Sequence, residues 1–264
     1  MSSSIITLLT DFGLQDGYVA TMKGVILSIC PDAKLVDISH LIAPQNVRSG
    51  AFVLLASCGY FPPGTVHMAV VDPGVGTERG AIAVRTRSSF FVGPDNGLFS
   101  LVLRDETGWE ARSLENPQFR RSPLSSTFHG RDLFAPAAAH LALGVRFDTL
   151  GPACVPVIPQ WDQPIIGKGE VQGEVIHIDR FGNAITNVRS EVLEKQGPWE
   201  KWTMEAGKSL INSIHKTYGR VGTGEALALS GSSGFVEIAV NQGNAASELD
   251  LEMGTRVTFR LAGF

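Results

Sequence analysis

The sequence predicts two domains, an N-terminal α/β domain built on a largely parallel sheet and a small C-terminal all-β barrel domain. Strand-like segments alternate with amphipathic helical segments over 1–150, which is typical of a parallel sheet covered by helices on both faces. A proline-rich stretch without periodicity over 151–170 indicates a linker. Over 171–264 only short strand-like segments remain, separated by glycine and asparagine, and this pattern favours a small barrel.

The elements of the first domain follow from the spacing of apolar residues. A helix is expected over 16–31, because apolar residues recur there every three or four positions until Pro31 ends the pattern. Similar reasoning predicts helices over 46–61 and 131–143, and the sequence PDNG predicts a turn over 94–97. The expected strands are short β-rich segments, and they cover 4–10, 33–39, 65–72, 81–86 and 89–93.

The second domain is expected to be a small all-β barrel or sandwich. Its segments are short and strand-like, and glycine and asparagine residues separate them. The expected strands cover 173–179, 184–188, 225–230, 234–240 and 256–261.

Composition restricts the class of protein. The chain has 264 residues, of which 44% are hydrophobic, so it can bury one large core or two modest ones. The net charge is −4 and no basic stripe occurs, which argues against a nucleic-acid partner. No apolar run approaches the roughly 20 residues that span a membrane, and the N-terminus lacks the features of a signal peptide. Together with three cysteines that form no CxxC motif, this predicts a cytoplasmic protein without disulfides.

Several familiar catalytic motifs are missing from the sequence. It holds no GxxxxGK[ST] motif, no GxGxxG after a strand and no GxSxG motif. The six histidines do not follow the spacing of metal ligands such as HExxH. The sequence therefore predicts neither a bound cofactor nor a metal, and the remaining candidates are polar residues at strand ends, where ligands bind in open α/β sheets.

Asp11 ends the first expected strand, in the sequence LLTDFG. A carboxylate at this place can accept both hydrogens of a ribose diol, as the acidic residue of dinucleotide folds does. The alternative is an aspartate that caps the following helix.

Asp72 and Arg79 flank a glycine-rich turn after the third expected strand, in the sequence VVDPGVGTER. The turn lets the backbone approach a ligand closely. Arg79 can return to pair with Asp72, and a bidentate guanidinium would hold the carboxylate in one orientation and lower its pKa. The alternative is an ordinary turn with an exposed aspartate and an exposed arginine.

His129 lies at the expected start of a helix, in the sequence STFHGRDLF. The positive end of the helix dipole favours a neutral imidazole, which can accept a proton. The alternative is a structural histidine bonded to a backbone carbonyl. The neighbouring Arg131 and Asp132 are expected to form a solvated helix start.

Two turn regions of the second domain carry further candidates. In IDRFGNAITN, Asp179, Phe181 and Asn183 surround a turn, where an amide can bind an adenine edge and an aromatic ring can stack on the base. Ser232 and Ser233 lie beside glycines in a loop that suits a carboxylate or a phosphate. In both regions the alternative is a hairpin or loop made only of turn-forming residues.

Taken in order, these motifs resemble one known family. The resemblance runs from about Ile5 to Arg260 and identifies the S-adenosylmethionine hydroxide adenosyltransferases, which are related to the fluorinase and the chlorinase. It rests on LLTDFG, VVDPGVGTER, FVGPDNG, TFHGRDLFAPAAA, DRFGNAITN and GFVEIAVNQGNAA. The resemblance implies an α/β domain followed by a β-barrel, a homotrimer with sites between subunits, and hydrolysis of S-adenosylmethionine to adenosine and methionine.

The resemblance also assigns site residues by position. It implies a triad of Asp72, Arg79 and His129, ribose binding at Asp11, and a ring contact from Phe181. The remaining positions implied to contact substrate are Asn183, Val240 and Gln242 at the adenine, the last two through backbone, and Asp179, Ser232 and Ser233 at the methionine. Where the halogenases carry arginine at the second serine position this chain has Ser233, so the methionine end departs from their pattern.

The expected mechanism is attack of water or hydroxide at C5′ of the ribose. Asp72 would orient and polarise the water, Arg79 would fix Asp72, and His129 would take or relay the proton, with the formal base left open. A halide-using enzyme is disfavoured because the carboxylate of Asp72 repels an anion at short range. The motifs would also suit a non-catalytic adenosine or S-adenosylmethionine binder, or an unrelated nucleoside-processing enzyme. The expected partners are a small-molecule substrate and copies of the same chain, with no nucleic acid and no membrane.

Overall fold

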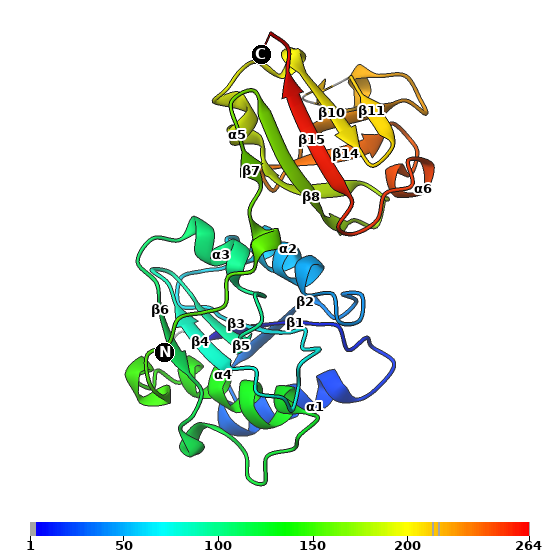
Figure 1. The fold of residues 1–264 in the computed structure, drawn as a ribbon. Coiled ribbons are helices and arrows are strands. Elements are labelled where there is room, and N and C mark those ends of the chain that lie inside the picture. Colours follow the sequence, from blue (N-terminus) through cyan, green and yellow to red (C-terminus); the bar gives the residue numbers. More distant parts are fainter. Residues whose placement is uncertain (1–3, 213, 216, 264) are drawn as a thin grey trace. The chain divides into compact units, whose positions relative to one another are not determined.

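The computed structural model describes residues 4–212, 214–215 and 217–263, and it divides into two compact units (Figure 1). Unit 1 ends at Pro159 and unit 2 begins at Gln160. The stretch 151–170, which the sequence indicates as a linker, is shared between them. Within it, Ile165–Ile166 forms β7, which pairs with the first long strand of unit 2.

Unit 1 is built on a six-stranded sheet with the order β2-β1-β3-β5-β4-β6. β2, β1, β3 and β5 run parallel, whereas β4 is antiparallel to both of its neighbours. The prediction of a largely parallel sheet is therefore confirmed. The strands are β1 (Ile5–Thr10), β2 (Lys34–Ser39), β3 (Val66–Val70), β4 (Ala81–Arg85), β5 (Phe90–Pro94) and β6 (Glu110–Ser113).

Helices cover both faces of this sheet (Figure 1). α1 (Tyr18–Ile29) packs with α4 (Ala135–Ala142), and α2 (Val47–Cys58) packs with α3 (Ser100–Asp105). Alanine dominates the buried residues of α4, and small side chains allow a helix to lie close against its neighbours. α3 and β6 were not predicted from the sequence, because both are too short to show a clear period.

The predicted helix over 131–143 has a composite structure. Gly130–Phe134 forms one π-helical turn, and α4 continues from Ala135 with Pro136 in its first turn. Proline is tolerated there because the first amides of a helix have no intrahelical partner. A π-helical turn changes the direction of the residues that precede it, and such turns occur often at functional sites.

Unit 2 is a nearly closed barrel, which confirms the predicted all-β class of the second domain (Figure 1). Its strand order is β11-β10-β15-β8-β9-β14-β13-β12, and its interior is filled by apolar side chains that include Trp202, Phe259 and Ile238. The remaining elements are β8 (Glu170–Ile178), β9 (Ala184–Arg189), β10 (Trp202–Ala206), β11 (Ser209–Ile211), β12 (Ile214–His215), β13 (Ala226–Ser230), β14 (Phe235–Val240), β15 (Arg256–Leu261), α5 (Ser190–Glu194) and α6 (Ala245–Glu248).

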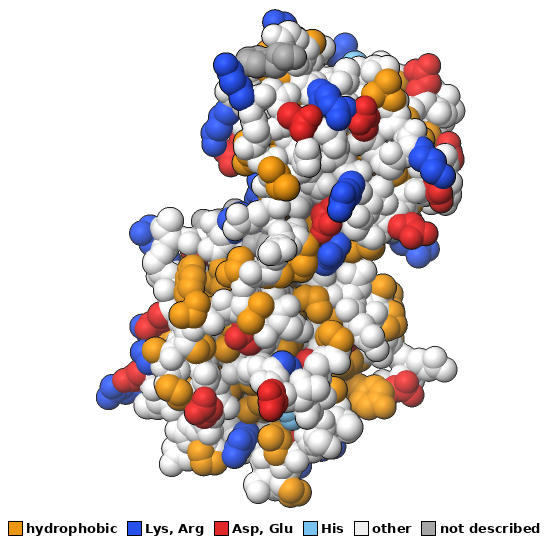
Figure 2. Space-filling model, in the orientation of Figure 1, with side chains coloured by type: hydrophobic (Ala, Val, Ile, Leu, Met, Phe, Trp, Pro, Cys, Tyr) orange, Lys and Arg blue, Asp and Glu red, His pale blue; other side chains and the backbone are white. Residues whose placement is uncertain are grey.

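The surface is mixed in charge. On the face drawn in Figure 2, basic and acidic side chains lie interspersed in both units, and hydrophobic side chains are most frequent on unit 1. Within the described ranges, no helix has both the length and the apolar character needed to cross a membrane.

Candidate active site

The carboxyl ends of two neighbouring strands begin the site in unit 1. β1 pairs in parallel with β3, with Thr10 opposite Val70, so Asp11 and Asp72 follow adjacent strands at the same edge of the sheet. Open α/β sheets bind their ligands outside this edge. The fold therefore places the two aspartates that the sequence predicts as site residues in one region.

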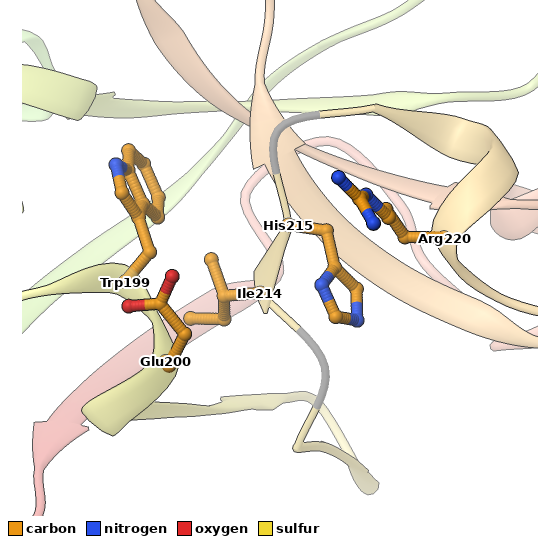
Figure 3. Close-up of a pocket in the computed structure, with 5 residues that line it drawn as sticks. All are labelled: Trp199, Glu200, Ile214, His215 and Arg220. Atoms are coloured by element: carbon orange, nitrogen blue, oxygen red, sulfur yellow. The ribbon is translucent and has the colours of Figure 1, made fainter.

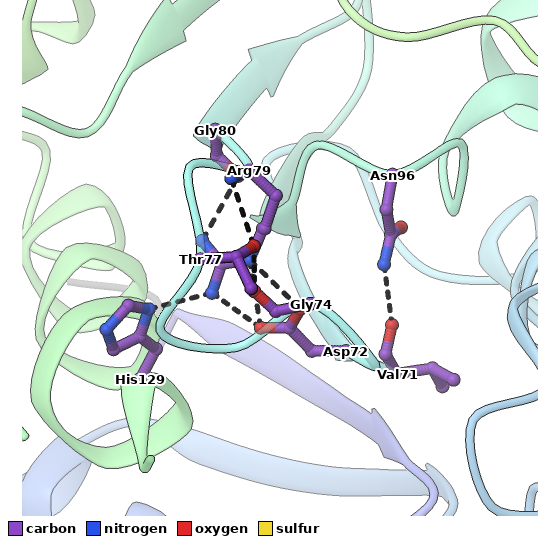
Figure 4. A network of polar contacts seen from close by, with 8 residues as sticks. All are labelled: Val71, Asp72, Gly74, Thr77, Arg79, Gly80, Asn96 and His129. Atoms are coloured by element: carbon purple, nitrogen blue, oxygen red, sulfur yellow. Dashed lines mark hydrogen bonds and ion pairs between the residues drawn. The ribbon is translucent and has the colours of Figure 1, made fainter. Parts of the chain in front are cut away.

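Arg79 pairs with Asp72 as its spacing predicts (Figure 4). Arg79 Nε donates to both carboxylate oxygens of Asp72, at 2.9 and 3.0 Å, and Nη2 donates to Oδ2 at 2.5 Å. The two side chains are only 10% and 5% exposed. The alternative of an exposed aspartate and an exposed arginine is therefore wrong, and the carboxylate is held in one orientation by a planar partner.

The turn between these two residues is held by its own contacts and by two neighbouring segments. Thr77 donates to the carbonyl of Gly74 from both its backbone and its side chain, at 3.1 and 2.7 Å. Gly76 has φ +76°, and a Cβ on it would lie 2.3 Å from the carbonyl oxygen of Ser126, so only glycine fits. Asn96, from the predicted PDNG turn, donates to the carbonyl of Val71 at 2.8 Å (Figure 4).

His129 completes the network from the residue that precedes the π-helical turn. Its Nδ1 lies 2.7 Å from Nη2 of Arg79 (Figure 4). A guanidinium can only donate, so Nδ1 must accept and the ring hydrogen resides on Nε2. Burial and the charge of Arg79 lower the pKa of His129 below its usual value near 6.5, against the opposite effects of Asp72 and Asp132. Burial and the guanidinium of Arg79 therefore both favour the neutral imidazole that the sequence predicts for His129.

The residues after His129 do not form the expected solvated helix start, because Asp132 is only 1% exposed. Arg131 donates to both of its carboxylate oxygens at 2.7 Å, and the backbone amide of Ser125 donates to Oδ2 at 3.0 Å. The hydrogen bonds from Arg131 are the largest influence that lowers the pKa of Asp132. This buried carboxylate ties the segment before His129 to the helix after it.

Asp11 is oriented by the backbone of a second loop. The amide of Gln45, a residue with φ +65°, donates to Oδ2 of Asp11 at 2.7 Å. α1 begins at Tyr18 with Gly17 as its N-cap residue, so the alternative that Asp11 caps this helix is wrong. Within the part of the chain that the structure describes, Oδ1 of Asp11 accepts no hydrogen bond and is available to a hydroxyl.

In unit 2, Asp179 organises the turn between β8 and β9. Its Oδ1 accepts the amides of Phe181 and Asn183 at 2.8 and 2.9 Å, and its Oδ2 accepts Nδ2 of Asn183 at 3.0 Å. Phe181 is 76% exposed, so its ring presents a free face for stacking. Gly182 lies against Asn244, and a Cβ on Gly182 would clash with that side chain.

The contact of Gly182 with Asn244 brings this turn next to the segment after β14. Gln242 has φ +60°, a left-handed conformation that few residues other than glycine adopt. The side chain of Val240 is buried in the barrel core, and its carbonyl accepts the amide of Gly243 at 3.0 Å. The structure therefore groups Asp179, Phe181 and Asn183 with the segment around Gln242.

Ser232 and Ser233 lie at the opposite end of β14. They form the tip of the hairpin between β13 and β14, where the amide of Gly234 donates to the carbonyl of Gly231 at 2.9 Å. A strand rises about 3.3 Å per residue, so the six residues of β14 separate this tip from the Gln242 segment by about 20 Å. The two predicted substrate regions of unit 2 are therefore distinct.

One buried carboxylate between these regions was missed in the sequence. Glu237 of β14 is 8% exposed and accepts a hydrogen bond from the hydroxyl of Tyr218. Burial raises the pKa of both groups, and the charge of Asp179 raises them further. The signal that could have revealed Glu237 is an acidic residue inside the apolar segment FVEIAV.

A separate hollow of unit 2 contains none of the predicted residues. It has a volume of about 450 Å³ and is lined by Trp199, Glu200, Ile214, His215 and Arg220 (Figure 3). His215 and Arg220 lie on one side of Ile214, and Trp199 and Glu200 lie on the other (Figure 3). Across the described residues, no group of three or more histidine, cysteine, aspartate or glutamate side chains is arranged to hold a metal.

Comparisons with known proteins show the family of the chain. A protein of Thermus thermophilus named (R)-S-adenosyl-L-methionine hydrolase is 41% identical over 96% of this chain and 98% of its own length. A fluorinase of Nocardia brasiliensis is 27% identical over 97% of both chains. A solved structure of an uncharacterised conserved protein from Thermotoga maritima matches with a TM-score of 0.87 and 37% identity, over 97% of this chain and 99% of that chain. The models of the N-terminal and C-terminal domains of the SAM hydroxide adenosyltransferases match residues 6–151 and 173–258, and the chain belongs to this family.

Proposed function

We propose that the protein hydrolyses S-adenosyl-L-methionine to adenosine and L-methionine, by attack of water at C5′ of the ribose. The observation that carries this proposal is the buried network of Asp72, Arg79 and His129 at the carboxyl edge of the sheet. The name of the Thermus thermophilus relative supports the same reaction. A network of this kind suits the activation of a polar nucleophile, because it holds a carboxylate acceptor in one orientation.

Each end of the substrate has candidate residues. Asp11 offers an open oxygen to the ribose diol, and Phe181 offers an exposed ring to the adenine. Asn183 and the backbone at Val240 and Gln242 would bind the edge of the base. At the methionine end, Ser232 and Ser233 would bind the carboxylate, and Asp179, whose charge acts on Glu237 between the two regions, would bind the amine.

The reaction requires activation of water rather than of the leaving group. A sulfonium leaves as a neutral thioether, so no acid is needed at sulfur, and neither a metal nor another cofactor is required. The water oxygen gains positive charge as it attacks C5′, and the carboxylate of Asp72 stabilises that charge and accepts the hydrogen bond.

The tautomer of His129 decides its part in this scheme. Its Nδ1 already accepts from Arg79, so its Nε2 carries a hydrogen and acts as a donor. Asp72 is therefore the acceptor for the water, and His129 keeps the guanidinium of Arg79 in the plane of that carboxylate. The proton reaches solvent after the carbon–oxygen bond has formed.

The pH dependence follows from that tautomer. Protonation of His129 puts hydrogens on both ring nitrogens, so Nδ1 no longer accepts from Arg79. Because the pKa of His129 is lowered, the neutral form persists down to pH values below 6.5. We expect kcat/KM, measured from pH 5 to 9, to fall only as the pH decreases below 6.5. His129→Gln offers an amide oxygen that does not titrate and should flatten this acid limb, whereas an acid limb with its midpoint above pH 7 would contradict the assignment.

Isotope labelling tests the reaction itself. In ¹⁸O-labelled water the label should enter the 5′-hydroxyl of adenosine and should be absent from methionine, as measured by mass spectrometry. The substrate is supplied as each sulfonium epimer in turn, because the relative's name carries the (R) descriptor. Chloride or fluoride added to the assay should give no 5′-halogenated nucleoside, since Asp72 repels anions. Label in methionine, or binding without turnover, would refute the proposed hydrolysis.

We also propose that the protein is a homotrimer with sites shared between subunits, and that it acts in the cytoplasm. The proposed substrate residues are divided between unit 1 and unit 2. This division supports sites that are formed by unit 1 of one chain and unit 2 of another. A closed ring of three identical heterologous interfaces would repeat one such site three times.

A further inference from the structure

His40 lies outside the network described above, yet it contacts the residues on both sides of Asp11 and Phe12. Its Nδ1 lies 2.8 Å from Oγ1 of Thr10, the last residue of β1. Its backbone carbonyl accepts the amide of Gly13 at 2.8 Å. The amide of Phe12 also donates to Oγ1 of Thr10, at 3.2 Å. One histidine thus holds both ends of the four-residue segment 10–13.

A second row of polar groups holds His40 from behind. Its Nε2 lies 3.1 Å from Oδ1 of Asp37, and Lys23 of α1 donates to Oδ2 of Asp37 at 2.6 Å. Because Thr10 Oγ1 accepts the amide of Phe12, the hydroxyl hydrogen is free to bond to Nδ1 of His40. Nε2 then carries the ring hydrogen and faces Asp37.

A hydroxyl, an imidazole and a carboxylate in series form the pattern of an activated nucleophile. Burial rules out that role here, because Thr10 is 0% exposed and His40 is 4% exposed. No substrate atom can reach the hydroxyl. Thr10, His40 and Asp37 must therefore act by fixing the backbone on both sides of Asp11.

The same segment that begins at His40 also orients the carboxylate of Asp11. The amide of Gln45 donates to Oδ2 of Asp11 at 2.7 Å, five residues beyond His40. The side chain of His40 therefore fixes the backbone of Asp11, and the loop that follows His40 fixes its carboxylate. Because the backbone and the carboxylate of Asp11 are both fixed, its Oδ1 points in one direction.

We infer that His40 is a positioning residue for nucleoside binding, which presets Asp11 for the ribose hydroxyls through Thr10 and the 40–45 segment. This inference rests on the proposed function, because it assumes that Asp11 binds the ribose. His40 touches no substrate atom. Its effect is to lower the conformational cost of binding the nucleoside, rather than to speed the chemical step.

Binding of adenosine, measured by calorimetry on the full chain, tests this inference apart from turnover. His40→Ala should weaken adenosine binding about 10-fold and raise KM by a similar factor, with kcat changed less than about 3-fold. His40→Asn keeps a polar atom near the place of Nδ1 and should restore most of the affinity. His140→Asn is the matched control, because the ring of His140 packs edge-to-face with Phe119, and the substitution should leave affinity unchanged.

The Asp11→Asn background separates positioning from general stability. If His40 acts through Asp11, adding His40→Ala to Asp11→Asn should weaken adenosine binding less than about 2-fold further. The inference would be overturned if the double variant lost adenosine affinity by the product of the two single-variant factors. It would also be overturned if a folded His40→Ala protein bound adenosine with unchanged affinity. Should His40→Ala fail to fold, Thr10→Val takes its place, with Thr10→Ser as the variant expected to restore binding.

The wild-type protein distinguishes this inference from the proposed function. Adenosine binding without hydrolysis of S-adenosyl-L-methionine would refute the function and leave the role of His40 standing. Hydrolysis with no effect of His40→Ala on adenosine affinity would refute the role of His40 alone. Failure of the wild-type protein to bind adenosine would refute the role of His40, whereas the isotope-labelling experiment decides the proposed function.

Discussion

Asp72→Asn is expected to lower kcat by about 10²- to 10⁴-fold, with a much smaller effect on KM. The substitution keeps the shape of the side chain but removes the charge that stabilises the attacking water. It also places an amide nitrogen, which donates, against a guanidinium that makes three donor contacts to the carboxylate. Initial rates over a range of substrate concentrations separate the two parameters, because the lost interaction forms mainly in the transition state.

One further arginine variant extends this prediction, and a second provides its control. Arg79→Lys should also lower kcat strongly, since a single ammonium cannot contact both oxygens of Asp72 and Nδ1 of His129 together. Arg85→Lys is the matched substitution on β4, where the arginine is half exposed and pairs with Glu110, and it should leave kcat unchanged. If Asp72→Asn instead turns over at nearly the wild-type rate, the carboxylate is only a turn residue and the proposed mechanism fails.

The fold class could be predicted because local pattern and tertiary structure agree in most of the chain. The apolar face of α1 and the wholly buried residues of β3 are both visible as periodicity or as a continuous apolar run. The missed strands β10 and β11 have only five and three residues, so their sequence is too short to show a clear period. Strand order, including antiparallel β4 between β5 and β6, depends on long-range pairing that no local window contains.

The site was predicted where short-range geometry determines it. Seven residues and a glycine turn are enough to bring Arg79 back to Asp72, so spacing alone indicated the pair. Asp132 was interpreted wrongly because adjacent charged residues at a helix start are usually solvated, whereas here Arg131 lies over the carboxylate and buries it.

Other parts of the site depend on contacts that spacing does not show. Asp37 is near His40 in sequence, but Thr10 lies 30 residues away on β1, and Lys23, which binds Asp37, lies on α1. By contrast, the distance of about 20 Å between the Ser232 tip and the Gln242 segment follows from β14, which the sequence predicts as the strand 234–240. A ligand that contacts both must therefore be extended along β14, and Glu237 lies midway on that path.

Complementation between two inactive variants is the sharpest test of shared sites. Asp72→Ala removes a residue of unit 1, and Asn183→Ala removes one of unit 2. Each variant expressed alone should be nearly inactive. If every site joins unit 1 of one chain to unit 2 of the next, a trimer that contains both variants should recover about a third of the wild-type activity, because one of its three sites joins an intact unit 1 to an intact unit 2. The variants are co-expressed with different tags, and the doubly tagged assembly is purified, sized by light scattering and assayed.

An Asp72→Ala chain co-expressed with an Asp72→Ala, Asn183→Ala double variant is the control and should remain inactive. Doubly tagged trimers that show no recovery, or a wild-type monomer with full activity, would rule out shared sites, since a site built within one chain loses one of its two halves in every subunit of such a mixture.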